Sequence, residues 1–231
     1  MSIIYPDQIN GAVLTCSSNY GDQATIASAS TFTSTGFKDA SVGLITSNES
    51  AGLIGSTSDI AAQKIFIWGG EDDTTVSPVF QAAQNELYQE YSATTTYTNA
   101  ADEAHWPSNE IIMDGLKWVY NELGWINTAD WVAADTDYTS YGSYYQFDQW
   151  EFFGVGSEND WCNDYYEESE LQDSGYVFVP TNCESTSCRT HFAFNGGGHP
   201  GEAQDYDGIL QYAATNDIIV VYPESMYWNS R

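Results

Sequence analysis

Basic residues are scarce in this sequence. Only five of its 231 residues are Lys or Arg, against 33 Asp or Glu, which gives a formal net charge of −28 at pH 7. Nucleic acids and anionic membrane surfaces carry negative charge themselves and would repel such a chain. We therefore predict no nucleic-acid partner and no membrane partner, and favour a soluble monomer that acts on a neutral or insoluble substrate.

Long apolar runs and export signals are also lacking. No run of eighteen apolar residues occurs, so no transmembrane helix is predicted. The first residues, 1–8, have neither the basic region nor the hydrophobic core of a signal peptide. Cys183 and Cys188 nevertheless flank a polar loop that can close a small disulfide, which would indicate an oxidising compartment; two free thiols are the alternative. Cys16 and Cys162 could pair or remain free.

Metal and phosphate motifs are missing as well. The three histidines have no zinc-ligand spacing, and no Asp-x-Asp-x-Asp-Gly calcium loop is present. No phosphate-loop lysine follows the glycine run 196–198. We therefore predict no metal site and no cofactor. His191 lies in a predicted strand, which favours a structural role. His199 lies in a Gly/Pro loop that is typical of the surface, and a metal ligand or a catalytic group is the alternative interpretation of it.

What is present is an alternation of apolar runs and amphipathic segments. This alternation predicts an α/β fold, with a mainly parallel sheet and helices on both faces. We expect one domain over 1–231, a long loop over 17–58, and a linker over 126–143 between its two halves. The predicted strands are 9–16, 65–68, 94–98, 145–153, 176–179, 190–194 and 218–221, and the predicted helices run from Pro78, from about Glu110 to Gly124, and over 202–215.

A candidate acid and base follow two consecutive predicted strands. The apolar run 65–68 stops at Gly69-Gly70 and leads into three acids that end at Asp73, and His105 lies in the loop after the next strand. Working residues of open α/β sheets lie beyond the carboxyl ends of the strands. In hydrolase triads the acid orients the imidazole, which takes the proton of the nucleophile. A solvated acidic turn is the alternative interpretation.

The nucleophile of such a triad is not found. No Gly-x-Ser-x-Gly occurs, the only two glycines four positions apart, Gly197 and Gly201, enclose His199, and no cysteine occupies an equivalent elbow. Gly196-Gly197-Gly198 does follow an apolar strand, where backbone N–H groups could stabilise an oxyanion.

Several of these segments carry a family resemblance that covers almost the whole chain. The chain resembles the extracellular polyhydroxybutyrate depolymerases, particularly the circularly permuted fungal type. The matching segments are 64–70, 73–76, 104–105, 114–120, 175–180, the loop between Cys183 and Cys188, 190–196 and 212–223.

The resemblance implies a role for individual residues. The acid of the family falls on Asp73, its base on His105, and its oxyanion-hole backbone donor on Gly197, within Asn195-Gly196-Gly197 where relatives carry His-Gly-Cys. The oxyanion segment comes after the acid and the base, which implies a circularly permuted α/β-hydrolase fold.

The resemblance also implies missing parts. Residues 1–7 resemble the helix that follows the serine elbow, and the chain stops shortly after 212–223, where the family continues. We therefore expect a fragment, truncated at both ends and without its nucleophile strand and elbow, of a secreted, extracellular serine esterase. Its substrates would be poly(3-hydroxybutyrate)-like polyesters or short-chain esters, and the fragment alone would be inactive. The alternative is a non-catalytic relative that binds a polymer or ester through an aromatic surface, since the chain has 17 Tyr and eight Trp.

Overall fold

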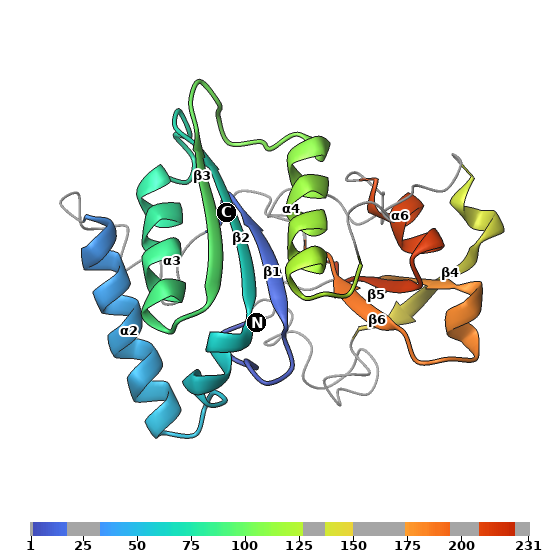
Figure 1. Ribbon diagram of the computed structural model, residues 1–231, viewed down its shortest axis with the longest axis horizontal. Coiled ribbons are helices and arrows are strands. Elements are labelled where there is room, and N and C mark those ends of the chain that lie inside the picture. Colours follow the sequence, from blue (N-terminus) through green and yellow to red (C-terminus); the bar gives the residue numbers. More distant parts are fainter. Residues whose placement is uncertain (1, 18–32, 127–136, 150–173, 195–207, 225–231) are drawn as a thin grey trace, which may run out of the picture. The chain divides into compact units, whose positions relative to one another are not determined.

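The computed structural model describes residues 2–17, 33–126, 137–149, 174–194 and 208–224, and divides the chain into two compact units (Figure 1). The first unit is Met1–Asp130 and the second is Trp131–Arg231. The boundary falls inside the linker predicted for 126–143, and the grouping of both halves into one domain stays a prediction. Within the described ranges, no helix has the length and apolar character needed to cross a membrane.

The first unit is built on a parallel sheet of three strands in the order β1-β2-β3 (Figure 1). The strands are β1 (Gly11–Thr15), β2 (Lys64–Gly70) and β3 (Thr94–Ala100). Lys64 pairs with Gly11 on one side and with Thr94 on the other, so the three strands start in step. Because all three run in the same direction, their carboxyl ends meet at one edge of the sheet. The predicted strands of this half are confirmed.

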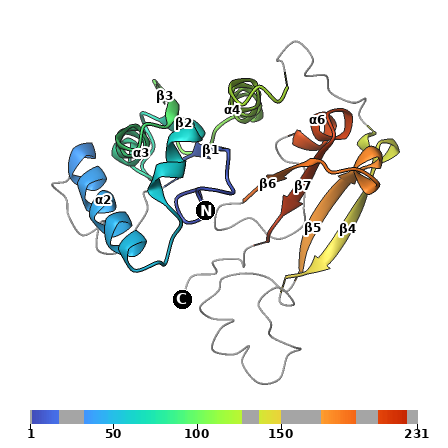
Figure 2. The same cartoon turned by 60° about the horizontal axis from the view of Figure 1, so that its bottom comes forward.

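Three helices cover the two faces of this sheet. They are α2 (Ser34–Ser50), α3 (Pro78–Glu90) and α4 (Asn109–Glu122). Figures 1 and 2 show α3 and α4 on opposite sides of the strands, with α2 beyond α3. The prediction of helices on both faces is confirmed for this unit.

The side chains of β2 explain why both faces need a helix. Ile65 and Ile67 are fully buried and pack with Leu87 of α3. Phe66 lies between them in sequence and points to the other face, because successive strand residues alternate. There it meets α4 at Gly115, where a Cβ would lie 2.7 Å from the Phe66 ring. A strand buried on both faces accounts for the continuous apolar run in the sequence.

The ends of the two predicted helices are set by ordinary caps. Ser77 accepts a hydrogen bond from the backbone N–H of Val79, and proline occupies the first turn of α3. Ser108 caps α4 in the same way, by accepting from the N–H of Ile111. Gly124 follows α4 with φ +65°, a left-handed conformation that glycine adopts at little cost.

The prediction of a loop over 17–58 is wrong for residues 34–50, because they form the helix α2. This helix is rich in Ser, Thr and Gly, whose low helix propensity hides it in the sequence. It forms because Phe37, Ser41 and Ile45, spaced four residues apart, are buried. Phe37 packs against Phe80 of α3, with ring centroids 4.6 Å apart and the ring planes tilted by 35°. Tertiary packing therefore supplies the stability that the local sequence lacks.

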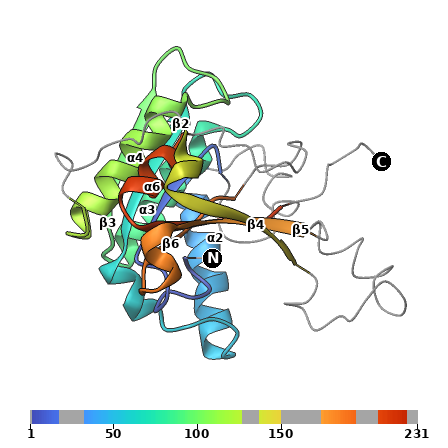
Figure 3. The same ribbon diagram turned by 90° about the vertical axis from the view of Figure 1, so that its right-hand side faces the viewer.

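The second unit contains a mixed four-stranded sheet in the order β4-β5-β7-β6 (Figure 2). Figure 3 shows β4 and β5 of this sheet side by side. The strands β4 and β5 pair antiparallel, as do β5 and β7, whereas β6 and β7 are parallel. The two antiparallel pairs were not predicted by the alternation of elements. The bounds are β4 (Gly142–Asp148), β5 (Ser174–Pro180), β6 (Arg189–Phe192) and β7 (Ile218–Tyr222), with the helix α6 (Ile209–Thr215).

The core of this sheet lies on the face toward α6. Phe178 of β5, Val220 of β7 and Leu210 of α6 are fully buried. The strand β4 begins at Gly142, three residues before the strand predicted over 145–153, and residues 150–153 lie outside the described part of the chain. The same is true of residues 202–207, the first part of the helix predicted to precede β7. Taken together, the described elements form an α/β fold.

Candidate active site

The carboxyl edge of the first sheet brings two loops into close contact. The loop after β2 is held to the loop after β3 by the N–H of Asp72, which donates to the carbonyl oxygen of Glu103 at 2.9 Å. Gly70 lies against the same loop, and a Cβ there would be 2.3 Å from the oxygen of Glu103 and 2.2 Å from that of Ala104. Only a residue without a side chain lets the two loops approach so closely.

This contact places Asp73 beside His105. The Oδ2 atom of Asp73 lies 2.9 Å from Nδ1 of His105. The other carboxylate oxygen, Oδ1, accepts from the N–H groups of Thr75 and Val76, both at 2.8 Å. The side chain of Asp73 is 1% exposed and that of His105 is 21% exposed. The two residues predicted as acid and base are therefore adjacent, with the acid buried and the base reaching solvent.

The surroundings of Asp73 keep it ionised. Burial alone would raise the pKa of this carboxyl, but hydrogen bonds from Val76, His105 and Thr75 outweigh it and hold the pKa below its ordinary value. An ionised carboxylate can only accept hydrogen bonds, so Nδ1 of His105 must carry the proton. In the neutral imidazole with this tautomer, Nε2 carries the free lone pair that a general base needs.

Cys16 is the residue of this edge that the sequence did not indicate. It follows β1 directly, with φ 46°, and its thiol donates to the backbone oxygen of His105. Its side chain is not in a disulfide, which resolves the pairing with Cys162 that the sequence left open. The parallel pairing of the three strands would have indicated Cys16, because the residues that follow β1, β2 and β3 all lie at the same edge of the sheet.

The thiol of Cys16 is unsuited to be the nucleophile. Burial, and then the charge of Asp73 and a hydrogen bond to it, raise the pKa of this thiol to about 12. The reactive form of cysteine is the thiolate, which is therefore rare here at neutral pH. The sequence-based conclusion that no cysteine acts from an elbow stays a prediction, and the chemistry of Cys16 supports it. With Asp73 and His105, Cys16 could still hold a metal ion.

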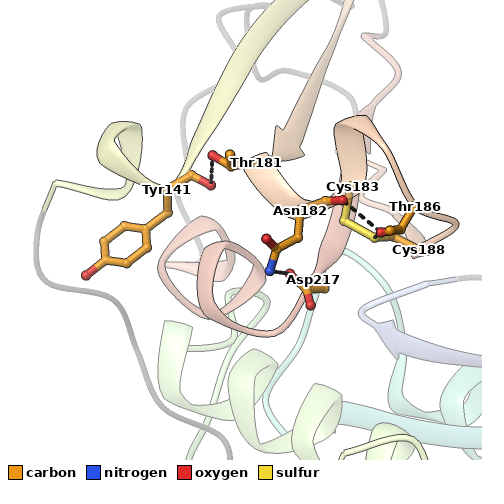
Figure 4. Close-up of a disulfide and its surroundings, with 7 residues drawn as sticks. All are labelled: Tyr141, Thr181, Asn182, Cys183, Thr186, Cys188 and Asp217. Atoms are coloured by element: carbon orange, nitrogen blue, oxygen red, sulfur yellow. Dashed lines mark hydrogen bonds between the residues drawn. A yellow bond between two sulfur atoms is a disulfide. The ribbon is translucent and has the colours of Figure 1, made fainter.

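The predicted disulfide between Cys183 and Cys188 is present in the second unit (Figure 4). The loop that it closes is tied down on both sides. Thr186 Oγ1 donates to the oxygen of Asn182 at 2.7 Å, and Asn182 Nδ2 donates to Asp217 Oδ1 at 3.1 Å. The disulfide therefore anchors the connection between β5 and β6, and it is remote in sequence from the acid and base.

Of the other candidate residues, the structure describes His191 but not Gly197 or His199. Gly197, predicted as the oxyanion-hole donor, and His199 lie outside the described residues. His191 lies in β6 and is partly buried, and this burial lowers its pKa to about 4. Its imidazole is therefore neutral at neutral pH, which fits the structural role predicted for it.

Comparison with known proteins identifies one curated relative. A polyhydroxybutyrate depolymerase of Talaromyces funiculosus is 25% identical over 214 residues, covering 77% of this chain and 55% of that protein. This chain thus spans about half the length of the relative that it matches. No protein-family model matches the chain.

Two solved structures share the fold. The crystal structure of a polyhydroxybutyrate depolymerase from Penicillium funiculosum superposes with a TM-score of 0.58 at 22% identity, covering 79% of this chain and 62% of that one. A serine-to-alanine variant of a polyhydroxybutyrate depolymerase, in complex with an R3HB trimer, superposes with a TM-score of 0.56 at the same identity and coverage.

Proposed function

This chain is a relative of the polyhydroxybutyrate depolymerases, and on that premise we propose that it carries the acid and the base of a carboxylic ester hydrolase. The observation that supports this most is the 2.9 Å contact between Asp73 Oδ2 and His105 Nδ1. Both residues were predicted for these roles, and both follow neighbouring strands at the carboxyl edge of a parallel sheet.

The proposed reaction follows from this geometry. His105 Nε2 takes the proton of the nucleophile as it attacks the ester carbonyl, and the imidazole becomes positively charged. The carboxylate of Asp73 stabilises that charge and stays ionised, since three hydrogen bonds fix it and lower its pKa. His105 then donates the proton to the departing alcohol. The amide of Gly197 is the proposed donor to the oxyanion.

We propose that the nucleophile is a serine that is not among these 231 residues. No Gly-x-Ser-x-Gly occurs in the sequence, and the thiol beside the relay is held protonated. The similar structure that holds an R3HB trimer is a serine-to-alanine variant.

The proposed substrates are poly(3-hydroxybutyrate)-like polyesters or short-chain esters. A neutral ester is not repelled by a chain of net charge −28. Trp106, which is 66% exposed, lies edge-on to His105 with ring centroids 4.9 Å apart and offers an apolar surface to the acyl chain. The disulfide supports an extracellular location, which we propose together with a monomeric state.

The proposal is tested with the chain itself and p-nitrophenyl butyrate. Residues 1–231 alone are expected to show no turnover of this ester that depends on His105, because loss of a triad serine lowers kcat by about 10^6. The same chain joined to a segment that carries a serine elbow is expected to gain turnover that disappears in His105→Gln. Absence of any such gain in a folded fusion would contradict the assignment. Turnover by the chain alone that depends on His105 would contradict an external nucleophile.

A non-catalytic polymer-binding role is the second candidate, and one observation favours it. Tyr145, Val177, Val221 and Phe192 are paired in one row across β4, β5, β7 and β6, and both aromatic rings at its ends are more than two-fifths exposed, at 48% and 45%. Such a row offers an apolar surface to a polymer. The fusion assay separates the two candidates, because a binding protein without a working relay gains no turnover.

A further inference from the structure

Three potential metal ligands meet at the carboxyl edge of the first sheet. Cys16 Sγ, a carboxylate oxygen of Asp73 and a ring nitrogen of His105 all lie within 4.8 Å of one another. The residues come from three different strand ends, and sequence separations of 89 between Cys16 and His105 and 32 between Asp73 and His105 hide them from any spacing motif. This is why the sequence predicted no metal site.

The donor set suits a late first-row divalent cation. Zinc binds thiolate sulfur at about 2.3 Å and imidazole nitrogen or carboxylate oxygen at about 2.0–2.2 Å, usually in a tetrahedron. Ligand atoms around such an ion are about 3.3–3.7 Å apart, so the three side chains need only small movements to enclose it. A thiolate and an imidazole select against calcium and magnesium, which prefer oxygen ligands.

Hydrogen bonds from the surrounding backbone hold two of the three potential ligands, Asp73 and Cys16, in place. The two N–H groups that bind Asp73 Oδ1 leave its Oδ2 directed at His105. Outer hydrogen bonds of this kind orient metal-binding carboxylates. The backbone N–H of Cys16 donates to the oxygen of Trp68 at 3.3 Å, which fixes the start of its loop to β2. The net charge of −28 raises the local concentration of cations.

We propose that Cys16, Asp73 and His105 form a binding site for a single Zn²⁺ or Co²⁺ ion, with water as the fourth ligand. Binding replaces the thiol proton, which leaves to solvent, and the proton on any ring nitrogen that becomes a ligand. A bound cation stabilises the thiolate of Cys16, which burial and the charge of Asp73 otherwise disfavour.

Occupation of this site and catalysis exclude each other, because the ion uses the same carboxylate and imidazole as the relay. Metal binding would therefore inhibit ester hydrolysis, and this consequence rests on the proposed function. The binding itself does not, so it is tested by a spectroscopic measurement without any substrate.

The experiment is a Co²⁺ titration of the 231-residue chain, without reductant so that the disulfide between Cys183 and Cys188 stays closed. Co²⁺ bound through Cys16 is expected to give a thiolate-to-cobalt charge-transfer band and the intense visible bands of a four-coordinate ion, saturating at one ion per chain and lost on addition of Zn²⁺. Surface carboxylates bind Co²⁺ without a charge-transfer band, so the band separates this site from the acidic surface.

Matched variants identify the ligands. Cys16→Ala and His105→Gln are expected to lose the band, whereas Cys162→Ala and Asp72→Asn are expected to keep it, since the first control removes another thiol and the second a neighbouring exposed acid. Cys16→Ser replaces Cys16→Ala if the alanine variant fails to show the circular dichroism of the parent. Absence of the band in the parent at saturating Co²⁺, or its survival in a folded Cys16 variant, would overturn the site.

Discussion

Replacing Asp73 with asparagine is expected to lower kcat for ester hydrolysis by about 10^4 in the proposed fusion of this chain to a serine-elbow segment. The carboxylate holds the proton of His105 on Nδ1 through the 2.9 Å contact. An amide can instead donate to Nδ1, which moves the ring proton to Nε2 and removes the base. Because binding of the ester does not use Asp73, KM should change little. Steady-state kinetics with p-nitrophenyl butyrate measure both quantities.

The neighbouring acid provides the control for this variant. Asp72 is exposed, and the hydrogen bond that ties its loop to Glu103 comes from its backbone N–H, which asparagine keeps. Asp72→Asn is therefore expected to retain the kcat of the parent. A kcat for Asp73→Asn within about tenfold of the parent, or an equal loss in both variants, would rule out Asp73 as the specific acid of the relay.

Replacing Gly70 with alanine is expected to lower the stability of the chain and to lower kcat in the fusion of the chain to a serine-elbow segment. The added Cβ would lie 2.2 Å and 2.3 Å from the carbonyl oxygens of Ala104 and Glu103, which belong to the backbone and cannot rotate away. The loop must therefore move by about 1 Å, and His105 moves with it. Overpacking of this kind costs about 1–3 kcal/mol of unfolding free energy. A displacement of about 1 Å in a catalytic group can cost about 10^2 in kcat.

A second glycine-to-alanine change separates the contact from the general effect of alanine. Gly43 lies within α2, is exposed, and has no atom within 4 Å of its would-be Cβ. Gly43→Ala should stabilise the helix by about 0.5–1 kcal/mol and leave the kcat of the serine-elbow fusion unchanged. Urea-induced unfolding measures the free energy of unfolding of Gly70→Ala and of Gly43→Ala against that of the parent. If Gly70→Ala unfolds at the urea concentration of the parent and keeps its kcat, the close loop contact does not position His105.

The parts of the fold that the sequence predicted are those with a strong local signal. The strand β2 is apolar on both faces, and Ser77 with a following proline marks the start of α3. Neither needs knowledge of distant residues. The helix α2 was missed because its stability comes from Ile45 and Phe37 packing against other elements. The antiparallel pairing of β4 with β5 was missed because pairing partners are not encoded in the order of elements.

The candidate site was predictable to a similar extent. Asp73 and His105 follow strands of a parallel sheet, so their loops could be expected at one edge before their distance was known. Cys16 lies at the same edge, but its approach to Asp73 depends on the register of β1 against β2. The register of β1 against β2 follows from the packing of the whole unit, so it could not be predicted from the residues around Cys16.

The relay itself is tested most directly by the protonation of the His105 ring in the 231-residue chain. Nitrogen-15 NMR distinguishes a ring protonated at Nδ1 from one protonated at Nε2, and the spectrum of His105→Gln assigns the signal. At a pH where the ring is neutral, we predict that Nδ1 carries the proton in the parent and that this preference is lost in Asp73→Asn. A neutral ring protonated at Nε2 in the parent would contradict the account, because His105 could then not take a proton from a nucleophile.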